Sequence, residues 1–571
     1  MDRDSVVDRE LPAAAGPAAQ PGTRGLNFYR CDPSLRGILA LYLDAEARAA
    51  LEPHLDRLGA LVGARLDDLA RAADRNPPAL QHRDRSGEDR QRIEHHPAWE
   101  EMERLALGEF ALTVMSHRAA LGRGAAWPSL AKYALTYLFA QSEFGLLCPV
   151  NMTDSLTRTI RRYAAPELLG RYLPRLLADD PAEMFQGAMF MTERFAGSDV
   201  GATLTRAAPE GQHWRLWGDK WFCSNADADL ALVLARPEGA GEGTRNLGLF
   251  LLPRMLEDGE PNHYRIVRLK EKLGTRAMPS GEIRLEGAIA YLVGDLGQGF
   301  KQMAEMVNQS RLSNGVRSAG IMRRAVHEAL AVARGREAFG RRLIELPLMR
   351  RQLAKMIVPA EQALAIVGYT ADCLDRADAG EAQAQAVRRI LTPLVKLRAC
   401  RDARKVTGDA MEARGGCGYI EEFIEPRLLR EAHLGSIWEG TSNIIALDVI
   451  RAARKAAAHE ALAETLAPLI ETAPGDLRAP LAGRLAAAVA FTERVAREGA
   501  SAEHLARQAA TGLYNATTAV LLAAHATALG EPWRAEAARL VLLHRLGTAD
   551  PLAPEVDDRR PVDALLAALA P

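Results

Sequence analysis

The stretch FKQMAEMVNQSRLSNGVRSAGIMRRAVHEALAVARGREAFG occupies residues 300–340 and has the apolar spacing of one helix of roughly 35 residues. A second stretch, LMRRQLAKMIVPAEQALAIVGYTADCLDRA at residues 348–377, predicts another helix of about 28 residues. Helices of globular proteins average ~11–12 residues. Two such long neighbours therefore favour an antiparallel helical bundle in the second half of the chain.

The segment before this bundle, from Met184 to Val293, has a different period. It contains short β-rich runs separated by turn residues: GAMFMTE, HWRLWGDKWF, LALVLAR, NLGLFLLPR and EIRLEGAIAYLV. Alternation of apolar and polar residues in HWRLW and EIRLE is typical of half-buried strands. The Gly-rich PEGAGEGTRN, from Pro237, predicts the tip of a hairpin. We therefore expect a β domain here.

Helical periodicity also covers both ends of the chain. From Ile38 to about Leu177 the pattern is helical, interrupted by NPPALQHRDRSGEDRQRIEHHP from Asn76, which predicts a surface loop. An Ala-rich helical tail begins near Lys455. The predicted multidomain α+β organisation is a flexible N-terminal arm at 1–26, an N-terminal α-helical domain at 27–183, a middle β domain at 184–295, an α-helical bundle at 296–454 and an extra C-terminal helical domain at 455–571.

The charge of the 571-residue chain is balanced. Lys and Arg number 72 against 73 Asp and Glu, a formal net charge of −1. This balance excludes a protein that binds nucleic acid or anionic lipid through a global basic field, although a local basic patch stays open. With 48% hydrophobic and 25% charged residues, the chain has the composition of a globular protein with a substantial core.

The spacing of the cysteines and the sequence of the N-terminus indicate the cellular compartment of the protein. The six cysteines are scattered and none forms C-x-x-C, so neither a disulfide framework nor a metal site is predicted. The opening MDRDSVVDRELPAAAG lacks an apolar signal-peptide core, and no stretch reaches the ~20 apolar residues of a transmembrane helix. We expect a cytoplasmic protein with no membrane insertion.

Two segments of the β region have the residues of a ligand site. Thr192 and Ser198, in MTERFAGSDV, follow a strand end and offer hydroxyls to an anionic or heteroaromatic ligand; a plain strand-to-turn junction is the alternative. In KWFCSN, alternation turns Trp221 and Phe222 to opposite faces, so that one ring can stack on a planar ligand while Ser224 bonds it. The alternative there is a core strand. No Rossmann or P-loop signature accompanies them.

Five segments together, MTERFAGSDV, WRLWGDKWFCSN, ARGREAFGRRL, GGCGY and SIWEGTSNI, resemble the acyl-CoA dehydrogenase family in order and spacing. The resemblance covers roughly residues 95 to 455. NPPALQHRDRSG, EHHPAW, LCPVNMT and the helical tail resemble the AidB-like branch, which is linked to the response to alkylation damage. The implied fold is an N-terminal α domain, a middle β-barrel or sandwich and a C-terminal four-helix bundle, plus the extra helical domain.

The resemblance implies FAD as cofactor and places its site. Thr192 bonds the pyrimidine side of the flavin, Phe222 takes the position of the usual indole, and Ser224 replaces a threonine near N5. Arg336, in R-x-x-F-G, reaches the FAD pyrophosphate of a neighbouring subunit, which implies at least a dimer and typically a homotetramer. The full implied set is Met191, Thr192, Ser198, Phe222, Ser224, Arg336, Phe339, Trp438, Thr441 and Asn443.

The resemblance also implies the chemistry. Glu439 is the base that removes the α-proton of an acyl-CoA, Arg311 orients it, and a hydride passes from the β-carbon to flavin N5. Apolar Ile437 and Trp438 beside Glu439 favour its desolvation, which raises the pKa of a carboxyl group towards that of a useful base. Ser310 stands where some relatives carry the base instead. The expected substrate is a short or branched acyl-CoA, with an electron-transferring flavoprotein as acceptor.

Several residues depart from the family pattern. Glu412, Arg350 and Ile445 replace glutamines, and Trp438 replaces a common tyrosine that it exceeds in size, which narrows the acyl pocket. These changes affect residues expected near FAD or the acyl group.

Two alternatives stay open. One is an AidB-like, DNA-associated protective flavoprotein with weak dehydrogenase activity; from Arg451 onward 13 Lys and Arg stand against 14 Asp and Glu, so the charge of this tail argues weakly against DNA. The other is a monooxygenase or oxidase on the same fold, which retention of Glu439 disfavours.

Overall fold

The computed structural model describes residues 20–547, 552 and 558–569. Of the predicted arm at 1–26, residues 1–19 lie outside this range. The remainder packs on the body of the molecule: Thr23 is buried and donates to Glu328, and Arg414 donates to the carbonyl of Pro21 at 2.7 Å. Residues 20–26 are therefore held in place.

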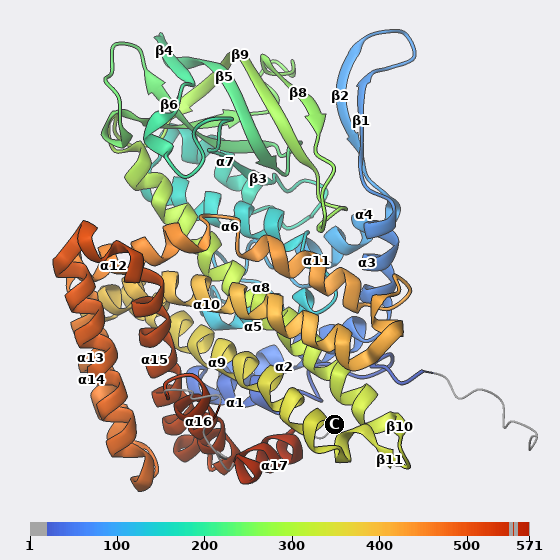
Figure 1. The fold of residues 1–571 in the computed structure, drawn as a ribbon. Coiled ribbons are helices and arrows are strands. Elements are labelled where there is room, and N and C mark those ends of the chain that lie inside the picture. The colour runs from blue at the N-terminus through green and yellow to red at the C-terminus, as the bar shows by residue number, and fades with distance from the viewer. Residues whose placement is uncertain (1–19, 548–551, 553–557, 570–571) are drawn as a thin grey trace, which may run out of the picture.

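The predicted long helices are confirmed, and they form the centre of the molecule (Figure 1). The elements of this part are α8 Gly299–Gly335, β10 Glu337–Ala338, β11 Arg341–Arg342, η4 Leu343–Glu345, α9 Pro347–Asp378, α10 Ala382–Arg414, η5 Gly415–Tyr419, α11 Glu425–Gly435 and α12 Ser442–Ala456. Helices α8 and α10 approach closely at Gly315. A Cβ added at this position would lie 2.2 Å from Val395 Cγ1. Glycine is therefore required at this crossing.

The N-terminal part is helical, as predicted, with one difference. Its elements are α1 Pro33–Tyr42, α2 Ala45–Val62, α3 Arg65–Arg75, β1 Ala79–Arg83, β2 Asp89–Glu94, α4 Pro97–Arg104, the π-helical η1 Leu105–Glu109, α5 Ser129–Ala140, α6 Leu147–Tyr163 and α7 Pro166–Leu176. Strands β1 and β2 form a hairpin where the sequence predicted a loop. The Asp84 carboxylate accepts from the N–H groups of Ser86 and Glu88 and so shapes the turn, and Gln91 bonds the backbone of Ile266. These contacts stabilise strands whose side chains are mostly exposed.

The middle part is the predicted β domain. Its strands are β3 Gly187–Phe190, β4 Arg206–Glu210, β5 His213–Ser224, β6 Leu230–Pro237, β7 Gly248–Pro253, β8 Tyr264–Leu269 and β9 Ser280–Leu292, with short helices η2 Val200–Ala202 and η3 Thr244–Asn246. The order is β3-β6-β4-β5-β9-β7, with β8 on β9. Because β7 also pairs with β6, the sheet closes into a small barrel. The antiparallel β6–β7 pair confirms the hairpin around PEGAGEGTRN.

The C-terminal extension is helical and packs along the bundle (Figure 1). Its elements are α13 Ala458–Thr472, α14 Gly475–Glu498, η6 Gly499–Leu505, α15 Ala506–Leu529, α16 Pro532–His544 and α17 Arg559–Ala568. Helix α15 is tied to the core by Gln362, which donates to Thr518 at 2.6 Å, and by a 2.8 Å contact between Tyr42 and His525. Among the described helices, including the Ala-rich α15, none has the length and apolarity needed to cross a membrane.

Candidate active site

Glu439 lies in a tight turn between α11 and α12. Its φ of +50° is in the left-handed region, which few residues other than glycine adopt, and the following Gly440 has a φ of +113°. The turn directs the Glu439 carboxylate to α8, where the side-chain amide of Asn314 donates to Oε2. Strained backbone of this kind is often kept where it places a functional group.

Arg311 of α8 holds this turn through its backbone. Its Nε donates to the carbonyl oxygen of Glu439 at 3.1 Å, and its Nη1 bonds Asp448 of α12 at 2.8 Å. Arg389 of α10 bonds the same carboxylate at 2.7 Å. Arg311 and Glu439 are thus brought together, but Arg311 contacts the main chain of Glu439 and not its carboxylate.

The electrostatic surroundings of Glu439 act in two directions. Burial raises the pKa of Glu439 above its usual value, while the charges of Lys396, Arg317 and Arg311 oppose that rise. Lys396, 1% exposed, donates to the carbonyls of Gly435 and Gly440 at 2.6 and 3.3 Å and so braces both ends of the turn. A carboxylate withdrawn from water in this way suits proton abstraction.

An aromatic wall stands beside this carboxylate. The rings of Phe144 and Trp438 stack with centroids 6.1 Å apart and 28° between their planes. The guanidinium of Arg317 lies 4.9 Å from the first ring centroid and 5.3 Å from the second. We refer to Phe144, Trp438 and Arg317 as the wall.

The two ligand segments of the β domain lie side by side. The backbone N–H of Trp221 donates to the carbonyl of Thr192 at 2.8 Å, and buried Lys220 donates to Glu193 at 2.8 Å. Phe222 is 56% exposed, whereas its neighbour Trp221 is half-buried. The Lys270 ammonium lies 3.6 Å from the Trp221 ring centroid and 4.9 Å from that of Phe222. Phe222 is therefore the ring available for stacking.

The remaining predicted cofactor residues occupy several places. Ser198 is exposed and Met191 and Ser224 are half-buried at the same end of the β domain, while Thr441 and Asn443 are exposed at the start of α12. The Lys220–Glu193 pair was missed by the sequence analysis. Its available signal was a lysine directly before the apolar run Trp221-Phe222-Cys223 in β5.

Arg336 and Phe339 lie at the far end of α8. Arg336 follows that helix by one residue, 25 residues after Arg311, and a helix of that length spans ~37 Å. Its guanidinium donates to the carbonyl of Arg414 at 3.1 Å beside Gly415, and Phe339 is 94% exposed. The structure does not bring Arg336 to Glu439 within one chain.

These two surfaces suit the two halves of FAD. The strand ends around Thr192 and Phe222 offer hydroxyl and backbone groups beside an exposed ring, a donor set for a flavin. The Arg336 guanidinium next to the glycines of η5 is suited to a pyrophosphate.

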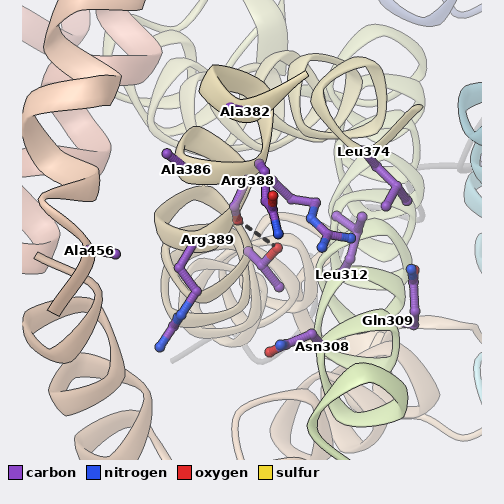
Figure 2. A pocket seen from close by; sticks show the side chains of 11 residues that line it. Asn308, Gln309, Leu312, Leu374, Ala382, Ala386, Arg388, Arg389 and Ala456 are labelled. Atoms are coloured by element: carbon purple, nitrogen blue, oxygen red, sulfur yellow. Dashed lines mark hydrogen bonds between the residues drawn. The ribbon is translucent and has the colours of Figure 1, made fainter. Parts of the chain in front are cut away.

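Two cavities adjoin the site on another face of α8. One, of about 340 Å³, lies between α8, α9, α10 and the end of α12, and Asn308, Leu312, Arg388 and Arg389 are among its lining residues (Figure 2). The second, of about 290 Å³, shares Gln309 with the first. Glu439 lines neither cavity, so both lie apart from the carboxylate.

Comparison with known proteins finds three family domains along the chain. Residues 19–180 match the adaptive response protein AidB N-terminal domain, residues 188–288 the acyl-CoA dehydrogenase middle domain and residues 297–454 the acyl-CoA dehydrogenase C-terminal domain.

Individual relatives cover most of the chain. The putative acyl-CoA dehydrogenase AidB of Escherichia coli is 37% identical over 68% of this chain and 72% of its own length. Acyl-CoA dehydrogenase family member 11 of Caenorhabditis elegans is 32% identical over 77% of this chain and 72% of its own. The crystal structure of Caenorhabditis elegans ACDH-11 in complex with C11-CoA superposes with a TM-score of 0.87 at 28% identity, covering 93% of each chain. The chain therefore belongs to the AidB-like branch of the acyl-CoA dehydrogenase family, oxidoreductases that act on CH–CH bonds and contain FAD.

Proposed function

We propose that this protein is an FAD-dependent dehydrogenase that forms a double bond between Cα and Cβ of a short or branched acyl-CoA. The observation that carries this proposal is the Glu439 carboxylate, partly withdrawn from water and fixed by Asn314 in a left-handed turn. In the ionised state it takes the α-proton of the thioester, and in our proposal the backbone N–H of Glu439 donates to the thioester oxygen as negative charge develops there.

Bound FAD supplies the acceptor for the hydride that leaves the β-carbon. In our proposal, the flavin ring of FAD binds on one side to the β-domain residues Met191, Thr192, Ser198, Phe222 and Ser224. On the other side it binds to the facing loop, through Trp438, Thr441 and Asn443. Arg336 and Phe339 serve the FAD of a neighbouring subunit, because ~37 Å of helix separates them from the catalytic turn. We therefore propose a homotetramer, at least a dimer, that passes its electrons to an electron-transferring flavoprotein.

The wall is the feature from which we propose a short or branched acyl group as the substrate. We propose that Phe144, Trp438 and Arg317, which pack against one another next to the Glu439 turn, limit the depth of the acyl site and so disfavour a long straight chain. The ACDH-11 structure holds C11-CoA, and chain length is therefore a question for direct measurement.

The first test uses an acyl-CoA series. Anaerobic addition of butyryl-CoA or isovaleryl-CoA to the purified holoprotein is expected to bleach the flavin absorbance near 450 nm, about tenfold or more faster than straight chains of twelve carbons, since a clash costs ~1–3 kcal/mol. If only long chains bleached the flavin, the proposed chain length would be wrong. If no thioester bleached it, the proposed function would fail.

The second test concerns Arg336. Replacing it with Gln removes a charge-assisted bond to phosphate, worth about 1.5–3 kcal/mol, so we expect FAD to dissociate roughly 10- to 100-fold more readily. Titration of the apoprotein with FAD gives the dissociation constant, and size-exclusion chromatography reports the assembly. Arg341→Gln, an exposed arginine of the neighbouring β11, is the control for lost charge. Equal FAD affinity in both variants would contradict the role of Arg336.

The DNA-associated alternative requires a basic face on α12, where Arg451, Arg454 and Lys455 are exposed. Arg451 bonds Asp448 at 3.2 Å, and this pairing reduces the charge available to a phosphate backbone. We therefore put the dehydrogenase first.

A further inference from the structure

Arg317 is a buried cation of α8 with an unusual set of neighbours. Its side chain is fully buried. It donates to Asn314 Oδ1 at 2.9 Å and has longer contacts of 3.4 and 3.5 Å with the carbonyls of Ser313 and Phe144. Across the described part of the chain, no carboxylate lies within the 4.0 Å of an ion pair with it, unlike buried Arg323 on the same helix. A buried guanidinium without a direct counter-ion is costly, and it strongly favours a negative charge nearby.

Asn314 connects this cation to Glu439. It is fully buried, one helical turn before Arg317, and it donates through Nδ2 to Glu439 Oε2. Because a guanidinium only donates, the amide oxygen of Asn314 must face Arg317 and the amide nitrogen must face the carboxylate. The orientation of Asn314 is thereby fixed, and the three side chains form a line from the buried charge to the carboxylate.

We propose that Asn314 and Arg317 are positioning residues that fix the Glu439 carboxylate and keep it ionised. This rests on the proposed function, in which Glu439 is the base. Arg311 contributes differently, because it bonds the backbone of the turn. The carboxylate itself receives its hydrogen bond from Asn314, whose donor is set by Arg317.

Other charged and titratable groups also face Glu439. Lys396 and Cys400 approach from α10, Arg311 from α8 and Cys148 from α6. Burial raises the pKa of Cys148 to about 11 and also raises that of Cys400, so both thiols stay neutral near pH 7. Lys396 is a cation held by backbone carbonyls.

Lys272 is another group that titrates in the pH range over which flavin reduction is measured. It lies near Cys148, and burial lowers its pKa to about 7. Asn314→Leu leaves every charge in place, so a shift of its profile is not caused by a changed charge near Lys272.

The sign of the expected effect follows from the charge. Glu439 acts when ionised, so the rate of flavin reduction falls as the pH drops through its pKa. Removing the Arg317 charge disfavours the carboxylate and raises that pKa, and the half-maximal pH moves upward by about one unit, within the range that a neighbouring opposite charge produces. Removing the Asn314 amide acts in the same direction and also frees the carboxylate to move.

The experiment measures the pH profile of anaerobic flavin reduction in the holoprotein by stopped flow, with the acyl-CoA that bleaches it fastest. Arg317→Met and Asn314→Leu are each expected to shift the half-maximal pH upward. Arg317→Lys keeps the positive charge and is expected to return the half-maximal pH most of the way to the wild-type value. The matched control is Arg334→Met, since Arg334 is a partly buried arginine of α8 that donates to the carbonyls of Leu566 and Leu569, ~26 Å further along the helix. Its profile is expected to match the wild type.

A double-mutant cycle tests the relay without any substrate. If Arg317 and Glu439 are coupled, the change in urea unfolding midpoint of the double variant Glu439→Gln/Arg317→Met is expected to differ from the sum of the changes in the two single variants. Flavin absorbance and circular dichroism verify that each variant is folded; if Arg317→Met does not fold, Asn314→Leu replaces it in the profile and in the cycle.

The outcomes separate the two proposals. No bleaching by any thioester overturns the proposed function, and flavin reduction that survives Glu439→Gln places the base on another residue; in both cases the cycle decides the relay alone. An unshifted profile, or strictly additive changes in the unfolding midpoint, overturns the relay even where Glu439 proves to be the base.

Discussion

Replacement of Glu439 with glutamine is expected to lower the rate of flavin reduction by an acyl-CoA about 10³-fold or more, the upper range for loss of a general base. Glutamine matches glutamate in shape and leaves the turn and its Arg311 clamp in place, but its amide does not accept a proton. FAD is expected to stay bound, because Glu439 is not among the residues proposed to hold it. Anaerobic single-turnover absorbance measures both properties in one sample.

The control applies the same chemical change elsewhere. Glu498 is exposed at the end of α14, and Glu498→Gln is expected to reduce the flavin at the wild-type rate. A Glu439→Gln protein that is yellow and still bleaches normally would place the base on another residue.

Replacement of Arg323 with methionine is expected to cost about 3–5 kcal/mol of stability, the usual effect of breaking a buried ion pair from one side. Arg323 is fully buried in α8, where it pairs with Glu361 of α9 and lies 3.4 Å from Asp32, the residue that caps α1. It also bonds the hydroxyl of Tyr137 in α5 at 3.0 Å. One guanidinium therefore joins four helices, and methionine would leave two carboxylates buried without a cation. Urea unfolding measures the loss.

The loss is expected to depend on pH. Burial raises the pKa of Asp32, but the charge of Arg323, together with His327 and the hydrogen bonds from Leu35 and Tyr137, outweighs that effect and holds the pKa below its usual value. A carboxyl group whose pKa is lowered by folding stabilises the protein above its unfolded pKa of ~3.9, and this contribution disappears as the pH falls through the folded pKa. The deficit of Arg323→Met is therefore largest near neutral pH and smaller in acid.

An exposed pair provides the comparison. Arg65 bonds Glu101 at the surface, with 58% of the arginine side chain exposed, and Arg65→Met is expected to lower the free energy of unfolding far less than Arg323→Met, because solvent screens an exposed pair. Equal losses of unfolding free energy in Arg323→Met and Arg65→Met would show that the buried ion pairs of Arg323 stabilise the protein no more than an exposed pair does.

Local periodicity predicted most of the fold. The apolar spacing after Gly299 predicted α8 and α9, and alternation in HWRLW and EIRLE predicted β5 and β9. The segment from Asn76 was predicted wrongly as a loop. Its strands expose nearly all their side chains, so no apolar alternation marks them, and they depend on the Asp84 turn and on contacts with the β domain. Residues 20–26 were expected to belong to a flexible arm. Their buried contacts are made with helices far away in the sequence, and a local sequence pattern does not reveal such contacts.

The sequence alone determined the helical–β–helical order and the family, and it singled out Glu439 as the proposed base, since each depends on neighbouring residues or on motifs a few residues long. Only the tertiary structure decided what surrounds that carboxylate. Asn314, which bonds Glu439, is 125 residues away in the chain, and the burial that raises the pKa of Glu439 comes from several helices at once. The physical reason is that periodicity reports which face of an element is apolar, whereas desolvation and the pairing of buried charges depend on which faces meet.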